Sequence, residues 1–142
     1  MMTFLEALYG SQYYEISQKG RDGNKGRLNG NVFLSAFIII IIFLLIAMLM
    51  FFSPAFKESY NNSLQPSESI ITGKSLGKLI AIPLFAVIYL IVSKTVGSEL
   101  NFTRTVDSFM QYPEMEKEKA TAKVLAPFFI ALVLLLVFSL ID

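Results

Sequence analysis

Hydrophobic residues are concentrated in three long runs, and polar residues fill the segments between them. The first run extends from Val32 to Phe52, which is 21 consecutive residues without a charge. A helix needs about 20 apolar residues to cross a hydrocarbon core of about 30 Å. This run therefore predicts a first transmembrane helix over residues 32–53.

The second run is shorter, because only the 15 residues from Leu79 to Ser93 are free of charge. Lys78 and Lys94 flank it, and lysines at the ends of a span can extend their ammonium groups to the headgroups. A second transmembrane helix is therefore predicted over residues 76–96. Pro83 removes one backbone hydrogen bond within it and is a candidate helix kink. The alternative for this run is a re-entrant or interfacial segment.

The third run comprises the 18 uncharged residues from Val124 to Ile141, directly after Lys123. It predicts a third transmembrane helix over residues 123–142, in which Pro127 is a second candidate kink. Acidic residues follow Pro113 and basic residues come later, which is the order that a helix dipole favours. One helix is therefore predicted from Pro113 to residue 142, with its first turns outside the bilayer.

Residues 1–31 are predicted to form an amphipathic helix followed by a flexible hinge. The apolar positions of this segment recur at helical spacing opposite polar ones, as an interfacial helix requires. Glycines and basic residues follow, which indicates a Gly-rich basic hinge before the first span. The apolar positions are Leu5, Leu8, Tyr9, Tyr13 and Ile16, and the glycines are Gly20, Gly23, Gly26 and Gly30.

Residues 54–75 and 97–122 form the two loops between the predicted spans. The second loop is predicted to be partly helical, because its apolar residues share one face of a helix that could begin with Ser98 as its N-cap. That face comprises Phe102, Val106, Phe109 and Met110.

The distribution of lysine and arginine predicts the orientation of the chain. Four of these basic residues precede the first span and five lie between the second and third, against three between the first and second. Cytoplasmic segments carry the excess of lysine and arginine. The N-terminus is therefore predicted to be cytoplasmic, the loop over 54–75 extracytoplasmic and the C-terminus extracytoplasmic.

Composition agrees with an all-α membrane protein and excludes several chemistries. Of 142 residues, 54% are hydrophobic and only 16% are charged, which is unlike a soluble globule. The net charge of +1 gives no strong attraction to nucleic acid. There is no cysteine for an iron–sulfur cluster or thiolate-bound zinc, and no histidine to ligate haem. The sequence therefore predicts no cofactor, no metal site and no catalytic residue.

Transport and nucleotide binding are also disfavoured by the sequence. Proton and ion pathways usually place an ionisable residue inside a span, and the three uncharged runs contain none. Residues 73–75 read Gly-Lys-Ser, like the end of a phosphate-binding loop, but Glu68 stands where that motif has glycine. A nucleotide partner is therefore not predicted.

Two sets of residues are predicted to position the spans. Basic side chains near the membrane surface set the topology and anchor the helices, and the N-terminal group among them could also bind anionic lipid. Small residues at four-residue spacing allow close helix packing. The basic residues are Lys19, Arg21, Lys25, Arg27, Lys78, Lys94 and Lys123, and the packing pairs are Gly77 with Ala81 and Ala122 with Ala126.

These features favour a non-catalytic accessory, structural or assembly subunit of a larger complex in the bacterial inner membrane. Three short apolar helices bury little surface against each other, so other integral membrane subunits are expected as partners. One alternative is a homo-oligomeric channel or small-solute transporter, with its pore near Pro83 or Pro127. A second alternative is an interfacial lipid-modifying enzyme, with Glu99, Asp107 or Glu114 as its base.

Overall fold

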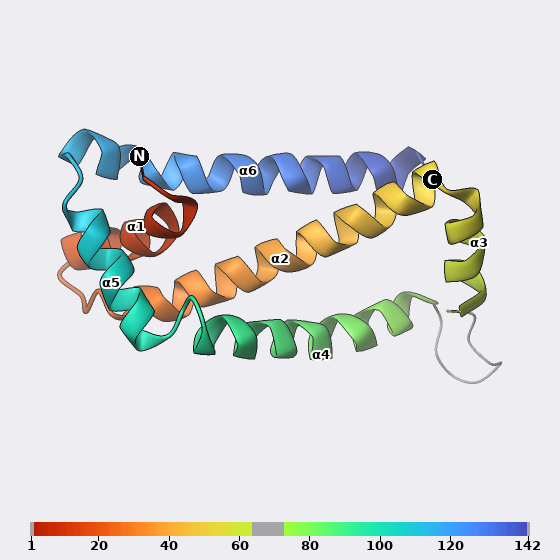
Figure 1. The fold of residues 1–142 in the computed structure, drawn as a ribbon, viewed down its shortest axis with the longest axis horizontal. Helices are drawn as coiled ribbons and strands as arrows, with labels where there is room; N and C mark the ends of the chain where they lie inside the picture. The colour runs from red at the N-terminus through yellow and green to blue at the C-terminus, as the bar shows by residue number, and fades with distance from the viewer. Residues whose placement is uncertain (1, 64–72, 142) are drawn as a thin grey trace.

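The computed structural model describes residues 2–63 and 73–141, and the regular structure in this part of the chain is entirely helical (Figure 1). This confirms the predicted all-α class. The helices, in chain order, are α1 (Phe4–Gln18), α2 (Lys25–Phe52), α3 (Pro54–Ser63), α4 (Gly73–Lys94), α5 (Glu99–Met110) and α6 (Glu114–Ile141).

Two of these helices are long and apolar enough to cross a membrane. They are α2 and α6, each 28 residues long, or about 42 Å at 1.5 Å per residue. The described stretch Ala81–Lys94 of α4 meets the same criterion only together with α5, and the two are bent by 67° where they meet. The membrane class predicted from the sequence is therefore supported, with two clear candidate spans and a third segment that is bent.

The long helices lie side by side, and the shorter ones gather at their ends (Figure 1). α2 runs between α4 and α6 and packs against both. α1, α5 and the first turns of α6 lie together at one end of the molecule, and α3 lies at the other. We refer to α1, α5, residues 25–31 of α2 and residues 114–123 of α6 as the cap.

Helix α1 is enclosed within the cap rather than lying open at its surface. It begins with a capping box, in which the Thr3 hydroxyl accepts the Glu6 N–H and the Glu6 carboxylate accepts the Thr3 N–H. It ends before Gly20, which adopts a left-handed φ of 73°. Leu8 and Tyr9 are almost completely buried among α2, α5 and α6. The predicted apolar face therefore exists, and most of it meets protein.

The segment predicted as a flexible hinge differs in the structure, because residues 25–31 are the first turns of α2. Gly26 and Gly30 lie where α1 crosses α2. A Cβ on Gly26 would lie 2.9 Å from the Tyr13 backbone nitrogen, and a Cβ on Gly30 would lie 2.5 Å from the Tyr9 ring. These glycines permit close helix approach instead of flexibility, and helix α2 begins seven residues before the predicted span.

Helix α5 follows the sequence expectation closely. The Ser98 hydroxyl accepts the Asn101 N–H and caps the helix, as predicted. Phe102, Val106 and Phe109 are buried against the rest of the cap, whereas Met110 is 43% exposed. The predicted apolar face therefore ends at Phe109.

The hydrophobic core lies mainly in the cap. Of the most apolar 18-residue stretches of α2 and α6, only 11% is buried within the protein. The largest fully buried side chains are those of Leu8, Tyr9, Asn31, Ser35 and Phe109, all in the cap or at its junction with the long helices. Outward-facing apolar residues then cover α4 and α6, with Ile82, Ile130 and Leu140 among the most exposed.

Candidate functional site

A buried polar cluster joins α1, the start of α2 and the turn between α4 and α5. It consists of Tyr9 from α1, Arg27 and Asn31 from α2, and Gly97 from the turn between α4 and α5; we call it the Asn31 cluster. The Tyr9 hydroxyl donates to Asn31 Oδ1 at 2.7 Å. Asn31 Nδ2 and Arg27 Nη1 both donate to the Gly97 carbonyl, at 3.3 Å and 3.2 Å. Three separate segments are thereby held together through one asparagine side chain.

Each buried polar group of this cluster has a hydrogen-bond partner. Asn31 is 2% exposed, and its backbone carbonyl accepts the Ser35 hydroxyl at 2.7 Å. Within the described residues, no buried side-chain nitrogen or oxygen lacks a partner. Burial raises the pKa of Tyr9 to about 12, so its hydroxyl keeps its proton and stays a donor. A satisfied buried network of this kind specifies one arrangement of the segments it connects.

Gly97 is required where the turn meets α1 and α2. A Cβ at this position would overlap Asn31 Oδ1 and lie 2.8 Å from the Tyr9 hydroxyl. The Gly97 N–H donates back to the Val92 carbonyl at 2.8 Å, which closes the end of α4. The turn therefore fits against α2 only because residue 97 has no side chain.

A second set of contacts ties α1 to the corner between α5 and α6. The Tyr112 hydroxyl donates to Glu6 Oε2 at 2.9 Å, and Lys117 Nζ lies 5.9 Å from the centre of the Tyr14 ring. The Thr3 backbone N–H, with a smaller contribution from Tyr112, lowers the pKa of Glu6, and the bond to Glu6 raises the pKa of Tyr112. At neutral pH Glu6 is therefore ionised and Tyr112 protonated, as their hydrogen bond requires.

An aromatic chain lies where the start of α1 meets the long helices. The Phe4 ring centre is 5.5 Å from that of Phe37, and Phe128 of α6 lies 6.0 Å from Phe37 and 4.9 Å from Phe33. Such tilted ring pairs add stabilisation beyond the buried area. They fix the N-terminus of α1 against α2 and α6.

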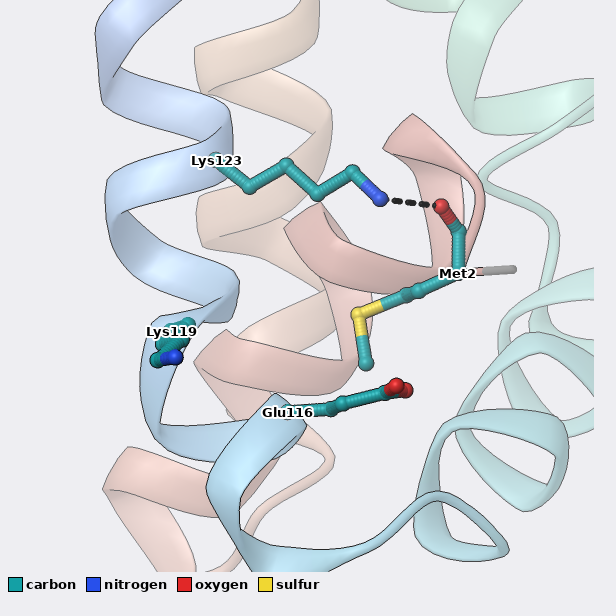
Figure 2. Close-up of a pocket in the computed structure, with 4 residues that line it drawn as sticks. All are labelled: Met2, Glu116, Lys119 and Lys123. Carbon is teal, nitrogen blue, oxygen red and sulfur yellow. Dashed lines mark hydrogen bonds between the residues drawn. The ribbon is translucent and has the colours of Figure 1, made fainter.

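The start of α6 and the N-terminus of α1 enclose a small pocket (Figure 2). It is lined by Met2, Glu116, Lys119 and Lys123 and has a volume of about 240 Å³; we call it the α6 pocket. Lys123 Nζ donates to the Met2 carbonyl at 2.5 Å. The Met2 side chain lies between Lys123 and Glu116 and is almost completely buried (Figure 2). Lys123 and Glu116 thus flank an apolar residue, and Lys119 lines the same pocket from α6.

The basic residues predicted as anchors have different surroundings. Lys123 belongs to the α6 pocket and Arg27 to the Asn31 cluster, and Lys94 is exposed at the end of α4. Lys19 forms an exposed ion pair with Glu15 at 3.1 Å. A separate hollow of about 670 Å³ at the turn between α1 and α2 is lined by Ile16, Arg21, Asp22, Asn24, Lys25, Leu28 and Asn29.

The small residues predicted to pack the helices have different surroundings. Ala122 and Ala126 lie on the exposed side of α6, because the face that meets α1 and α2 carries Ala120, Val124 and Ala131 instead. An apolar hollow of about 400 Å³ between α2 and α4 includes Ala81 in its lining, with Ala36, Ile39, Ile40, Ile82 and Phe85.

Pro83 and Pro127 each lie inside one helix, in α4 and α6 respectively. Gly77 and Lys78 are in helix α4, and Glu68 lies outside the described residues. The candidate bases Glu99, Asp107 and Glu114 are all exposed.

Sequence reasoning did not identify four residues that matter here: Met2, Asn31, Gly97 and Glu116. Asn31 did carry a signal, since it is a polar residue directly before the first apolar run. Gly97 followed the second run in the same way, but nothing local to either residue indicated that they meet.

The described residues contain no group of three or more acidic side chains close enough to hold a metal ion. Comparisons with protein families, with curated proteins and with solved structures find no match to this chain. The function is therefore inferred from the geometry of the chain itself.

Proposed function

We propose that this protein is a three-span accessory subunit of a larger inner-membrane complex, without catalytic activity of its own and with its cap in the cytoplasm. The observation that carries the proposal is the position of the core. Most buried side chains belong to the cap, whereas the long helices are mainly exposed to their surroundings. A chain built in this way has a rigid cytoplasmic body and leaves the faces of its membrane helices free for lipid or other subunits.

The length of α4 supports a third span. α4 comprises 22 residues, or about 33 Å, which matches a hydrocarbon core of about 30 Å. Helix α5 does not continue this span, because it turns away by 67° and buries its apolar face within the cap. Charged residues Glu99, Arg104 and Asp107 occupy its exposed side. The bend therefore separates a membrane helix from a cap helix.

The arrangement of basic residues supports the orientation. Segments 1–31 and 97–122 carry most of the lysine and arginine of the chain and lie at the same end of the molecule (Figure 1). The positive-inside rule favours this end as the cytoplasmic one.

Single cysteines test the orientation, because the chain contains no cysteine of its own. Asn62→Cys in α3 and Ser108→Cys in α5 are both exposed and lie at opposite ends of the molecule. In intact cells, a membrane-impermeant maleimide is expected to label residue 62 and to label residue 108 only after permeabilisation. The cysteine-free parent controls for background. Labelling in the reverse order would show that the cap is extracytoplasmic.

Three serine hydroxyls of the long helices favour an accessory role over a pore. Ser35, Ser93 and Ser139 each donate to a carbonyl of their own helix, at 2.7, 3.1 and 2.8 Å. The hollow between α2 and α4 is lined by apolar side chains alone. Neither feature provides the polar lining through which ions or small solutes would pass.

The outer face of α4 is the surface best suited to a partner helix. Among the described residues, α4 packs chiefly against α2. Its opposite face is apolar and exposed, with Val87 53% and Leu90 55% accessible. In lipid, helices associate through close van der Waals packing, so a partner must fit this face closely.

Val87→Trp is expected to release that partner, and Val133→Trp on α6 is the matched control. Both valines are exposed to a similar degree, 53% and 56%. Lipid accommodates a larger apolar side chain, whereas a packed helix does not. After gentle detergent extraction from the native host, wild type is expected to retain a membrane protein at fixed ratio. Val87→Trp should reduce its recovery at least about tenfold, which corresponds to about 1.4 kcal/mol.

The same extraction experiment can also give results that contradict the proposal. A protein that emerges alone and monomeric is not a subunit. Equal losses with both substitutions would place the partner on more than the α4 face. Ion conductance from the purified protein alone in liposomes would favour the channel alternative.

A further inference from the structure

We propose that the α6 pocket binds the headgroup of an amine-bearing phospholipid, with Lys119 and Lys123 holding the phosphate and Glu116 holding the ammonium group. The inference requires only that α6 crosses the membrane and goes beyond the role proposed for the whole chain. It follows from the depth of the pocket, the order of its charges and the position of Met2.

The pocket lies at the depth of the headgroups. Lys123 is the last charged residue before the 18 uncharged residues of α6 that enter the hydrocarbon. Its ammonium group therefore marks the membrane surface. Lys119 is about 6 Å farther along the helix and Glu116 about 10 Å, at 1.5 Å per residue. The polar layer on each side of a bilayer is about 5–8 Å thick. Both lysines therefore lie within the layer that holds the phosphates, and Glu116 lies at its outer edge.

The order of charges along α6 matches the order of groups in the lipid. Going outward from the hydrocarbon, the helix presents Lys123, then Lys119 and then Glu116, which is two cations followed by an anion. An amine-bearing phospholipid presents its phosphate first and its ammonium group beyond it. Each charged group of the lipid therefore meets an opposite charge on one face of α6.

The charged side chains of the pocket are free to bind such a headgroup. None of the three forms an ion pair within 4 Å in the described part of the chain, although Glu116 and Lys119 are only three residues apart. Lys123 Nζ uses one donor on the Met2 carbonyl and has two more. Met2 forms the apolar wall between the lysine and the glutamate (Figure 2). A glycerol backbone can rest against this wall while its phosphate faces the lysines.

Glu116 gives the pocket its selectivity. A phosphatidylglycerol headgroup carries the phosphate charge but no ammonium, so its binding leaves the carboxylate facing an anion without compensation. A phosphatidylcholine headgroup has a cation that cannot donate a hydrogen bond and is larger. Phosphatidylethanolamine alone among these three satisfies both ends of the pocket.

The test uses the full-length protein purified in lipid-free detergent and measures bound lipid by native mass spectrometry. The probes are short-chain phosphatidylethanolamine, phosphatidylcholine and phosphatidylglycerol, with inorganic phosphate as a competitor. Wild type is expected to prefer phosphatidylethanolamine. Lys119→Gln should weaken this binding about fivefold, since one surface lysine near lipid contributes about 1 kcal/mol. Glu116→Gln should shift the preference toward phosphatidylglycerol.

Lys94→Gln is the matched control. Lys94 is an exposed lysine at the end of α4 nearest the cap, and it lies outside the pocket. It should leave all three affinities unchanged. Thermal unfolding of each variant confirms that the fold is retained, and Lys119 is chosen over Lys123 because it makes no hydrogen bond within the described residues. Equal binding of the three lipids, or an equal loss with Lys94→Gln, would overturn the proposal. Competition by phosphate at the concentration of lipid would show a free-phosphate site instead.

Discussion

Gly97→Ala is expected to destabilise the cap by about 3–5 kcal/mol, a large part of the 5–15 kcal/mol that typically holds a protein folded. The added methyl group would overlap the Asn31 side-chain oxygen and press on the Tyr9 hydroxyl. The turn must then move away, and the carbonyl of residue 97 loses its two donors. The measurement is thermal unfolding in detergent, together with limited proteolysis of the cap.

A double-mutant cycle separates this collision from a general effect of alanine. Asn31→Ala alone should cost about 1–3 kcal/mol, because it leaves the Tyr9 hydroxyl without an acceptor. In the Asn31→Ala background, Gly97→Ala should cost less than about 1 kcal/mol, since the overlapping amide is gone. Equal costs of Gly97→Ala in both backgrounds would mean that the turn does not pack against Asn31.

Gly10→Ala is expected to have the second largest effect on stability. It should destabilise the protein, although the same change stabilises most helices. Alanine normally stabilises a helix interior by about 0.5–1 kcal/mol relative to glycine. In α1, however, a Cβ at residue 10 would overlap the buried Phe109 ring and lie 2.5 Å from the Phe109 Cβ. The variant is therefore expected to lose about 3 kcal/mol or more as α1 and α5 are forced apart.

Phe109→Ala supplies the matched partner for Gly10→Ala. Alone it should cost about 3–5 kcal/mol, because it leaves a cavity in the cap. Combined, the two substitutions should cost clearly less than their sum, since the new methyl group occupies part of that cavity. Calorimetry or denaturant unfolding of the four proteins gives the interaction energy. Additive effects would show that residues 10 and 109 are not in contact.

The two glycine predictions share one physical cause. Gly10, Gly30 and Gly97 lie at three different contacts, and at each one a side chain from another segment fills the space that a Cβ would need. Protein interiors are packed closely enough that one extra methyl group is felt. From the sequence, the glycines of residues 20–30 favoured a hinge, because glycine also permits flexibility. Only the neighbours decide which property of glycine is used.

The periodicity of α1 illustrates a similar ambiguity. The spacing of Leu8, Tyr9 and Tyr13 predicted a helix with one apolar face, and the helix is present. Such a face can meet lipid or protein with the same local pattern. Its burial depends on α5, whose Phe102 and Phe109 come about a hundred residues later. The four-residue spacing of alanines in α6 was ambiguous in the same way, and contact with α1 selected Ala120 rather than Ala122.

The amino-acid sequence by itself predicted that the chain is all-helical, that α2 and α6 are long and apolar enough to cross a bilayer, and that Ser98 begins a helix. These properties depend on local composition, because transfer from water to lipid and helix capping involve neighbouring residues only. Tertiary structure alone decided where the core lies, why Gly97 meets Asn31 and how Met2 completes a pocket with α6. Those contacts join residues 66 to 121 positions apart, so they follow from the path of the chain in space.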